Sequence, residues 1–264
     1  MEFQNLIFEK IDGVARITLN RPEVKNALNV PLLKDIAAAI QDIKADESIK
    51  ALIITATGDV FSSGGDVDFV YKLSCDQSPM EIREVLLEHY GAAALSLRTL
   101  NIPVIGAFNG AVMGAGFDFS LHMDFRLASE KAIFGSIWIR IATIPALGGM
   151  FLLPKIIGLT KATEMMMTGD TIDAQEAYRV GLINRIVPAD QLQDEAMNLA
   201  RRFTKSPKVA MSIIKQGIIR GLSGTLMSEV DWAVYMQAIA INAKDCQEGI
   251  RAFKERRKAN FQGK

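Results

Sequence analysis

Two short segments each combine a run of glycine and other small residues with an acidic side chain. Residues 111–120, AVMGAGFDFS, set one carboxylate, Asp118, between two phenylalanines just after three small residues. Residues 61–66, FSSGGD, form a second small-residue turn that ends in Asp66. Missing side chains let a ligand approach the backbone, and free N–H groups at a helix start favour negative charge. If the two turns converge, they can hold an oxygen that becomes negative during a reaction, beside an acid or base.

Each turn also has a simpler explanation, because small residues let a helix pack tightly on a sheet. The sequence leaves the pKa of Asp118 open as well. Its apolar neighbours raise a carboxyl pKa, whereas a helix start lowers it.

The elements around these turns predict an α/β core. Apolar runs at 51–55 and 102–107 read as buried strands that precede the two turns, and the second turn opens a helix. Further elements are expected as strands at 14–19, 125–128 and 133–134, a helix from Pro31, and a helix from the capping box at Ser78 to about Leu100. Strand and helix alternate to about residue 190, which is typical of an α/β fold.

The pattern of predicted secondary structure changes near residue 195. Beyond it the pattern predicts helices only, at 190–204, 207–220, 224–244 and 246–257. We therefore expect a core over residues 1–195 and a helical C-terminal region over residues 196–264.

Composition excludes several classes of protein. Lys plus Arg and Asp plus Glu are both 30, so no global field attracts nucleic acid or a membrane surface. Two cysteines, Cys75 and Cys246, form neither a disulfide framework nor a metal cluster. No signal peptide or spanning apolar run is evident, so we expect a cytoplasmic protein without a metal. The last fifteen residues carry six basic residues against Glu255, which suits a solvated face or an anion site.

Several motifs, taken in order, resemble the crotonase (enoyl-CoA hydratase/isomerase) superfamily. They cover about residues 6–261 and are Asn20-Arg21-Pro22, Asn26-Ala27-Leu28, FSSGGD, IPVIGAFNGAVMGAG, Asp124-Phe125-Arg126-Leu127-Ala128, Phe134-Gly135, TIPALGG at 143–149 and the terminal Glu248-Gly249…Ala252-Phe253…Arg256-Arg257. The resemblance implies a spiral of ββα units and a helical C-terminal region that builds homotrimers, often paired into hexamers. It also implies an acyl-CoA substrate and no separate cofactor.

The resemblance assigns roles to individual residues. The N–H groups of Gly65 and Ala115 would bind the thioester oxygen, and Asp118 would exchange protons with the neighbouring carbons. The coenzyme A would lie along a group of residues that consists of Val24, Ser63, Asp66, Val67 and Gly114. Arg256 would approach the phosphates of coenzyme A, in the same or a neighbouring subunit.

Two positions depart from the hydratases of this family, which carry two glutamates. One aligns with Asp118 and the other with Trp138, whose indole donates a hydrogen bond but exchanges no proton at neutral pH. Moving a double bond needs one base, whereas hydration shares its proton transfers between two groups, so we rank isomerisation above hydration. Family dehalogenases carry tryptophan near position 138, but their nucleophilic aspartate aligns with Ala146. Trp138 could also line a site for a bulky or cyclic acyl group, or fill core volume.

Other readings stay open. Thioester hydrolysis or decarboxylation could use the same site, and a non-catalytic member could bind RNA, although the balanced charge opposes this. A serine protease of similar architecture needs a Ser-His-Asp group that the sequence does not suggest. His89 or Tyr90 could supply a second proton donor, Arg140 could reach substrate if its segment is extended, and His122 is expected to be structural.

Overall fold

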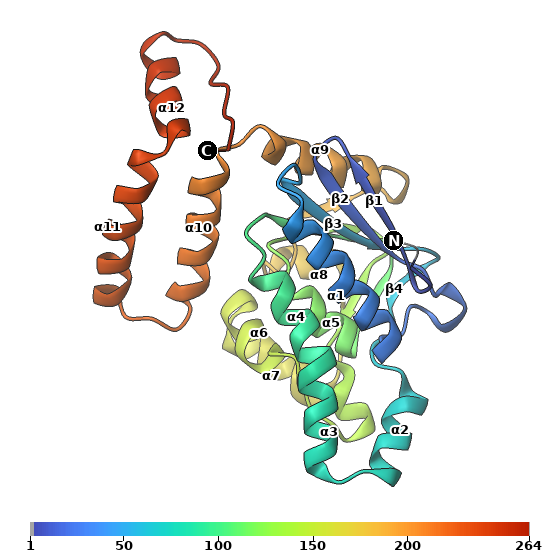
Figure 1. Ribbon diagram of the computed structural model, residues 1–264. Helices are drawn as coiled ribbons and strands as arrows, with labels where there is room; N and C mark the ends of the chain where they lie inside the picture. The colour runs from blue at the N-terminus through green and yellow to red at the C-terminus, as the bar shows by residue number, and fades with distance from the viewer. Residues whose placement is uncertain (1–2, 264) are drawn as a thin grey trace.

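The computed structural model describes residues 3–263, which form two β-sheets wrapped by helices (Figure 1). The larger sheet has the order β1-β2-β3-β5-β7-β10. Its strands are Leu6–Ile11, Val14–Leu19, Ala51–Ala56, Val104–Phe108, Phe125–Ser129 and Arg185–Val187. β1 and β2 pair antiparallel, and every other neighbouring pair is parallel.

The smaller sheet shows that the chain winds as a spiral. Its order is β4-β6-β8-β9, with strands Val60–Ser62, Ala111–Met113, Ile133–Gly135 and Thr171–Asp173. Three successive units, β3/β4, β5/β6 and β7/β8, each place one strand in each sheet, parallel to the strand of the preceding unit. This confirms the expected α/β fold with a spiral of repeated units.

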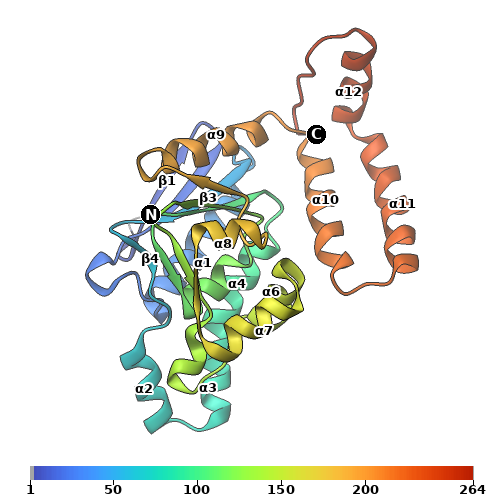
Figure 2. The same ribbon diagram turned by 180° about the vertical axis from the view of Figure 1, so that it is seen from behind.

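Helices cover both faces of the larger sheet (Figures 1 and 2). In β3, Leu52 and Ile54 join the core that includes α1 (Val30–Ala45), whereas Ala51 and Ile53 face α9 (Leu192–Thr204). Burial on both faces explains why this strand reads as an unbroken apolar run. The remaining core helices are α2 (Val67–Asp76), α3 (Pro79–Val85), α4 (Ala92–Arg98), α5 (Gly114–Ser120), α6 (Gly149–Ile157), α7 (Leu159–Thr168) and α8 (Ala174–Arg179).

The helix expected from Ser78 to about Leu100 exists but is interrupted. The capping box forms as expected, because Ser78 and Glu81 bond reciprocally at the start of α3. Between α3 and α4, residues Leu86–Gly91 adopt the wider π form. This insertion turns Tyr90 into the core, where it is buried.

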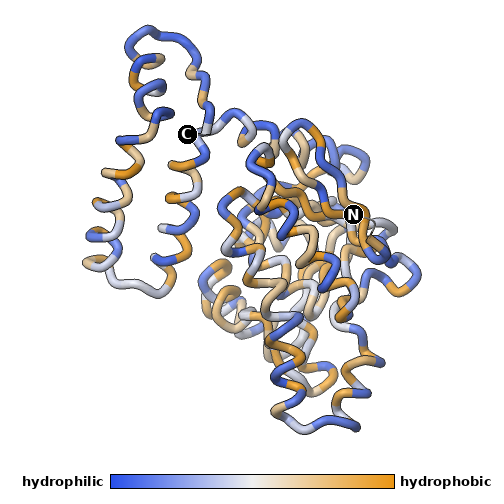
Figure 3. The backbone as a smooth tube through the Cα atoms, viewed as in Figure 1, coloured by the Kyte–Doolittle hydropathy of each residue, from blue (hydrophilic) through white to orange (hydrophobic). Residues whose placement is uncertain are grey.

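Three C-terminal helices project from the core (Figures 1 and 2). They are α10 (Lys208–Gly221), α11 (Leu226–Asn242) and α12 (Lys244–Lys254). α11 buries none of its residues although it is rich in apolar ones (Figure 3). The division expected at residue 195 falls inside α9, which packs on the sheet, and the projecting region begins with α10.

The spiral also imposes local packing limits that mutation can test. A Cβ atom added to Gly110 would lie 1.8 Å from the carbonyl oxygen of Asp59, which is fixed in the backbone. We expect Gly110→Ala to lower the free energy of unfolding by about 3 kcal/mol or more, because the strands must separate. Denaturant unfolding measures this. Gly221→Ala is the matched control, since a Cβ there meets nothing within 4 Å, and a loss as large as that of Gly110→Ala would contradict the prediction.

Candidate active site

The FSSGGD turn is held so that the N–H of Gly65 is left free. Leu28 donates its N–H to the oxygen of Gly64 (2.7 Å) and accepts from the N–H of Asp66 (3.0 Å). These two bonds form a parallel bridge between Leu28 and Gly65. In such a bridge the paired residue's own N–H points to the opposite side. Within residues 3–263 the N–H of Gly65 has no hydrogen-bond partner.

Buried polar groups fix this turn from behind. Ser62 donates its hydroxyl to the oxygen of Asn26 (2.9 Å), and the fully buried Asn26 amide donates to the oxygens of Thr57 and Val60. Tyr90 donates its hydroxyl to the oxygen of Leu28 (2.9 Å). Tyr90 therefore supports the turn through Leu28. Burial also raises the pKa of its phenol, which makes it a poor proton donor to substrate.

The second turn supplies another free amide at the start of α5. Gly114 adopts the left-handed conformation (φ +49°) as the chain passes from β6 into the helix. The first amides of a helix have no partner within it, and no side chain caps this one. The N–H of Ala115 accordingly has no bonded partner in the described part of the chain.

The two turns are in direct contact. A Cβ atom added to Gly64 would lie 3.5 Å from the nitrogen of Ala115, and one added to Gly65 would lie 3.9 Å from the Cβ of Ala115. On the other side of the turn, a Cβ added to Gly116 would lie 2.5 Å from the Cβ of Ser62. The structure thus brings together the two amides that the sequence analysis selected.

Asp118 lies one helical turn further along α5 and is fully buried. One carboxyl oxygen, Oδ2, accepts a hydrogen bond from the N–H of Leu147 (3.3 Å), while Oδ1 has no partner among the described residues. Burial raises the pKa of Asp118 to about 7, against smaller opposing effects of the Leu147 amide, the Trp138 indole and the Gly149 amide. Desolvation therefore outweighs the hydrogen bonds and favours the protonated form of Asp118.

Trp138 is half-buried beside this carboxyl. Its indole favours the charged form of Asp118, yet Nε1 is buried without a partner within hydrogen-bond distance in residues 3–263. The segment Ile137–Ile141 is a 3₁₀ helix and not extended. Residues two apart in a 3₁₀ helix point in different directions, so the condition under which Arg140 would share the face of Trp138 is not met.

The residues expected along coenzyme A lie in or next to the two turns, with one exception. The N–H of Ser63 bonds to the oxygen of Lys25, next to Val24, and Asp66 caps α2 by accepting from the N–H of Phe69. Val24 and Val67 are exposed, as a surface that binds a ligand requires. The exception is Arg256, which follows α12, and α12 projects from the core (Figures 1 and 2).

Sequence reasoning missed how closely the TIPALGG segment surrounds Asp118. A Cβ added to Gly149 would lie 2.4 Å from Oδ1 of Asp118, so only glycine fits there. His122 is buried, and its Nε2 lies 2.6 Å from the oxygen of Leu147. The order Leu-Gly-Gly was visible in the sequence, but its distance from Asp118 was not.

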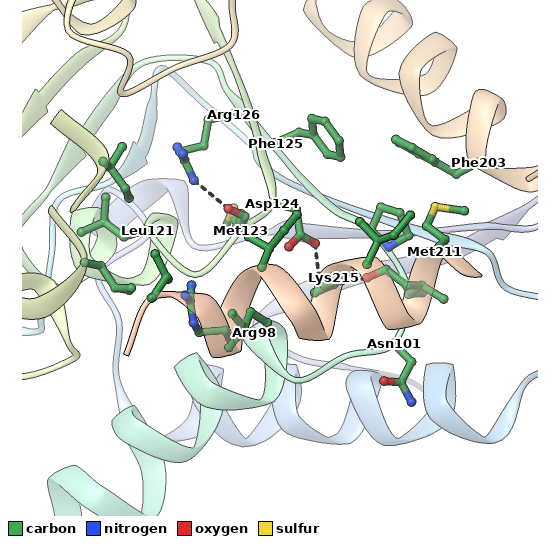
Figure 4. Close-up of a pocket in the computed structure, with 18 of the residues that line it drawn as sticks. Arg98, Asn101, Leu121, Met123, Asp124, Phe125, Arg126, Phe203, Met211 and Lys215 are labelled. Carbon is green, nitrogen blue, oxygen red and sulfur yellow. Dashed lines mark hydrogen bonds and ion pairs between the residues drawn. The ribbon is translucent and has the colours of Figure 1, made fainter. Parts of the chain in front are cut away.

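A cavity lies elsewhere, between α10 and the core (Figure 4). This cavity of about 520 Å³ is mainly apolar. Lys215 enters it from α10 and pairs with Asp124 (2.6 Å) while donating to the oxygen of Ile102 (3.0 Å). These contacts of Lys215 tie α10 to the core. Asp118 does not line this cavity.

The described residues contain no cluster of three or more His, Cys, Asp or Glu side chains arranged to hold a metal ion. Within the same range, no helix combines the length and apolar character needed to cross a membrane.

Comparison with known proteins identifies the family. A family model described as enoyl-CoA hydratase/isomerase matches residues 9–264. The chain belongs to this family. This confirms the resemblance to the crotonase superfamily and makes the chain an enzyme of hydratase/isomerase type.

Individual members of the enoyl-CoA hydratase/isomerase family cover the whole chain. A trans-2-decenoyl-[acyl-carrier-protein] isomerase of Streptococcus mutans is 31% identical over 100% of both chains. A crotonyl-CoA hydratase of Syntrophomonas wolfei is 33% identical over 99% of both. A crystal structure of a putative enoyl-CoA hydratase from Streptomyces coelicolor has a TM-score of 0.94 at 31% identity, covering 100% of this chain and 96% of that one.

The buried carboxyl predicts a pH-dependent gain in stability when it is removed. The folded chain binds the Asp118 proton more tightly than the unfolded chain, since its pKa rises from 3.8 to about 7. The contribution of this group to the free energy of unfolding therefore falls as pH rises from about 4 to 7. We expect Asp118→Asn to stabilise the protein more at pH 8 than at pH 5, by on the order of 2–3 kcal/mol.

Thermal melts at both pH values measure this difference. Asp190→Asn, the same change at an exposed site, should give equal shifts at the two pH values. A gain from Asp118→Asn that does not vary with pH would show that the carboxyl titrates normally.

Proposed function

We propose that this enzyme moves a carbon–carbon double bond in an acyl thioester through an enolate intermediate. The observation that carries the proposal is the arrangement of one buried carboxyl with a free oxygen beside two turns with free amides. The second position where family hydratases have a carboxylate holds Trp138. One base is sufficient for isomerisation.

The proposed reaction uses groups of this chain only. With a 3-enoyl thioester, Asp118 removes a proton from C2, and the electron pair delocalises into the thioester carbonyl. The N–H groups of Gly65 and Ala115 donate to the resulting oxyanion. Asp118 then returns the proton to C4, which gives the 2-enoyl thioester. A carboxyl with a pKa of about 7 suits both steps at neutral pH, because it is neither too weak a base nor too weak an acid.

Trp138 supports this assignment in two ways. Its indole N–H favours the carboxylate form of Asp118 without competing for the proton. Its half-buried ring lies beside Asp118 and exchanges no proton, so it offers no second group to activate a water molecule.

The family fits an acyl-CoA substrate, and we propose coenzyme A as the carrier. Val24, Ser63, Asp66, Val67 and Gly114 would line its path. One relative is named as an isomerase of an acyl group on acyl-carrier protein, so acyl-carrier protein is the alternative carrier to test. Relatives named as hydratases make hydration the second candidate function.

Incubation of the enzyme with 2-enoyl-, 3-enoyl- and cyclic dienoyl-CoA esters in deuterated water tests the reaction. We expect 3-enoyl and 2-enoyl esters to interconvert with deuterium uptake at C2 or C4 and no gain of water, as read by mass spectrometry. Asp118→Asn should reduce kcat by about 10²–10⁴-fold. The value of kcat/KM should rise with pH through about 7 as Asp118 loses its proton.

Asp190→Asn is the control, as an exposed acid outside the site. Rapid hydration of crotonyl-CoA together with an unchanged rate in Asp118→Asn would reject both the reaction and the base. Release of coenzyme A with a free thiol, together with the free acid, would indicate hydrolysis instead.

We also propose that the chain assembles as a homotrimer, or a hexamer of two trimers, through its projecting helices. In one chain α11 leaves large apolar side chains uncovered, among them Leu226, Met227, Val234 and Tyr235. An apolar face of this kind is costly in water unless a partner covers it. Arg256 could then meet the coenzyme A of a neighbouring subunit.

We expect Val234→Glu to shift the protein toward monomers, because it places a charge in the apolar face. Light scattering coupled to size-exclusion chromatography measures the mass. Gln41→Glu adds the same charge to the exposed side of α1 and should leave the mass unchanged. A monomeric wild-type protein at micromolar concentration would overturn the proposal.

A further inference from the structure

His122 has one strong partner and one unused nitrogen. It lies in the turn between α5 and β7, nearly fully buried, with Nε2 2.6 Å from the oxygen of Leu147. A carbonyl oxygen only accepts, so the ring must carry its proton on Nε2. Nδ1 has no partner among residues 3–263. Burial lowers the pKa of His122, against the smaller opposing effect of the Leu147 oxygen and with a minor contribution from the charge of Arg98.

The same short segment faces Asp118 on its other side. The N–H of Leu147 donates to Oδ2 of Asp118, the one hydrogen bond that this carboxyl makes to the described chain. The N–H of Gly149 also favours the charged carboxyl. The Leu147 carbonyl that His122 binds lies along the backbone between the N–H of Leu147 and the N–H of Gly149. A bond that holds this carbonyl therefore also limits the movement of both N–H groups.

Packing leaves this segment little room to move. Gly148 is held at φ +90°, and a Cβ there would lie 3.6 Å from Nε2 of His122. A Cβ at Gly149 would lie 2.4 Å from Oδ1 of Asp118. Leu147–Gly149 is thus confined between an imidazole and a carboxyl.

We propose that His122 is a positioning residue for Asp118, which holds Leu147–Gly149 so that its amides face the carboxyl. This rests on the proposed role of Asp118 as the base, and it gives His122 a part beyond filling the core. The imidazole acts through the backbone of Leu147. The charged side chain that acts on His122 is Arg98, whereas the groups that act on Asp118 are two amides and an indole.

A pair of substitutions separates positioning from simple packing. His122→Leu removes the donor, so the amides should drift from Asp118 and the carboxylate should lose support. We expect the midpoint of kcat/KM against pH to move upward by about half a unit or more, kcat at pH 7 to fall about tenfold, and KM to change little. His122→Gln keeps an N–H donor at similar reach and should restore most of both values.

Two results of this pair would overturn the proposal. One is a His122→Leu variant that folds, assembles as the wild type does and keeps the wild-type midpoint. The other is a His122→Gln variant that behaves like His122→Leu although it melts at the wild-type temperature.

If His122→Leu fails to fold, measurements on the wild type and His122→Gln decide the matter. The chain has two histidines, so a His89→Gln variant assigns their ¹⁵N ring signals. We expect Nε2 of His122 to carry a proton at pH 7, because it faces the oxygen of Leu147, and an Nδ1–H form with a bare Nε2 would contradict the proposal. The ¹³C signal of the Asp118 carboxyl reports its titration without any substrate. A failed activity test therefore rejects the proposed reaction and leaves the positioning role to be judged by these signals.

Discussion

The site depends on the contact between two glycine-rich turns. Gly64 and Gly65 lie against Gly114 and Ala115 so closely that an added Cβ atom would already be in van der Waals contact across the two turns. The spiral makes this contact possible, since β4 and β6 run parallel as neighbours and each leads into one turn. The N–H of Gly64 bonds to Ser62 and the N–H of Asp66 bonds to Leu28, so within residues 64–66 the N–H of Gly65 is the one left for a ligand. The backbone geometry therefore does more than any side chain to define the oxygen-binding position.

Asp118 places an ionisable carboxyl in a fully buried position next to these turns. The helix start and nearby amides favour its ionised form, but complete burial outweighs them. The result is a carboxyl that gains and loses a proton near neutral pH, at the expense of stability. Such a group is common at active sites, where environment and not residue type sets the pKa. The neighbouring indole and the Leu147–Gly149 segment adjust this balance without carrying a proton themselves.

Much of this could be predicted from the sequence, because local rules and long-range structure agree. Apolar runs predicted the buried strands β3 and β5, and the Ser78 capping box correctly predicted the start of α3. The sequence did not reveal β4 and β6, which have three residues each and so no measurable periodicity. It also left open whether Arg140 shares the face of Trp138, since the 3₁₀ helix there cannot be recognised from two residues. The links from His122 and Leu147 to Asp118 span up to 29 residues, and only the fold brings them together.

The π segment between α3 and α4 has a consequence for how this chain can change in evolution. A π turn arises when one residue is added to an α-helix, and here it carries the tyrosine that steadies Leu28. Losing one residue from Leu86–Gly91 would restore a regular helix and rotate everything before it by about 100° relative to α4. Substitutions along this helix can accumulate one by one, whereas a single-codon deletion would disconnect the phenol from the turn it supports. The length of this helix is therefore constrained more strictly than its composition.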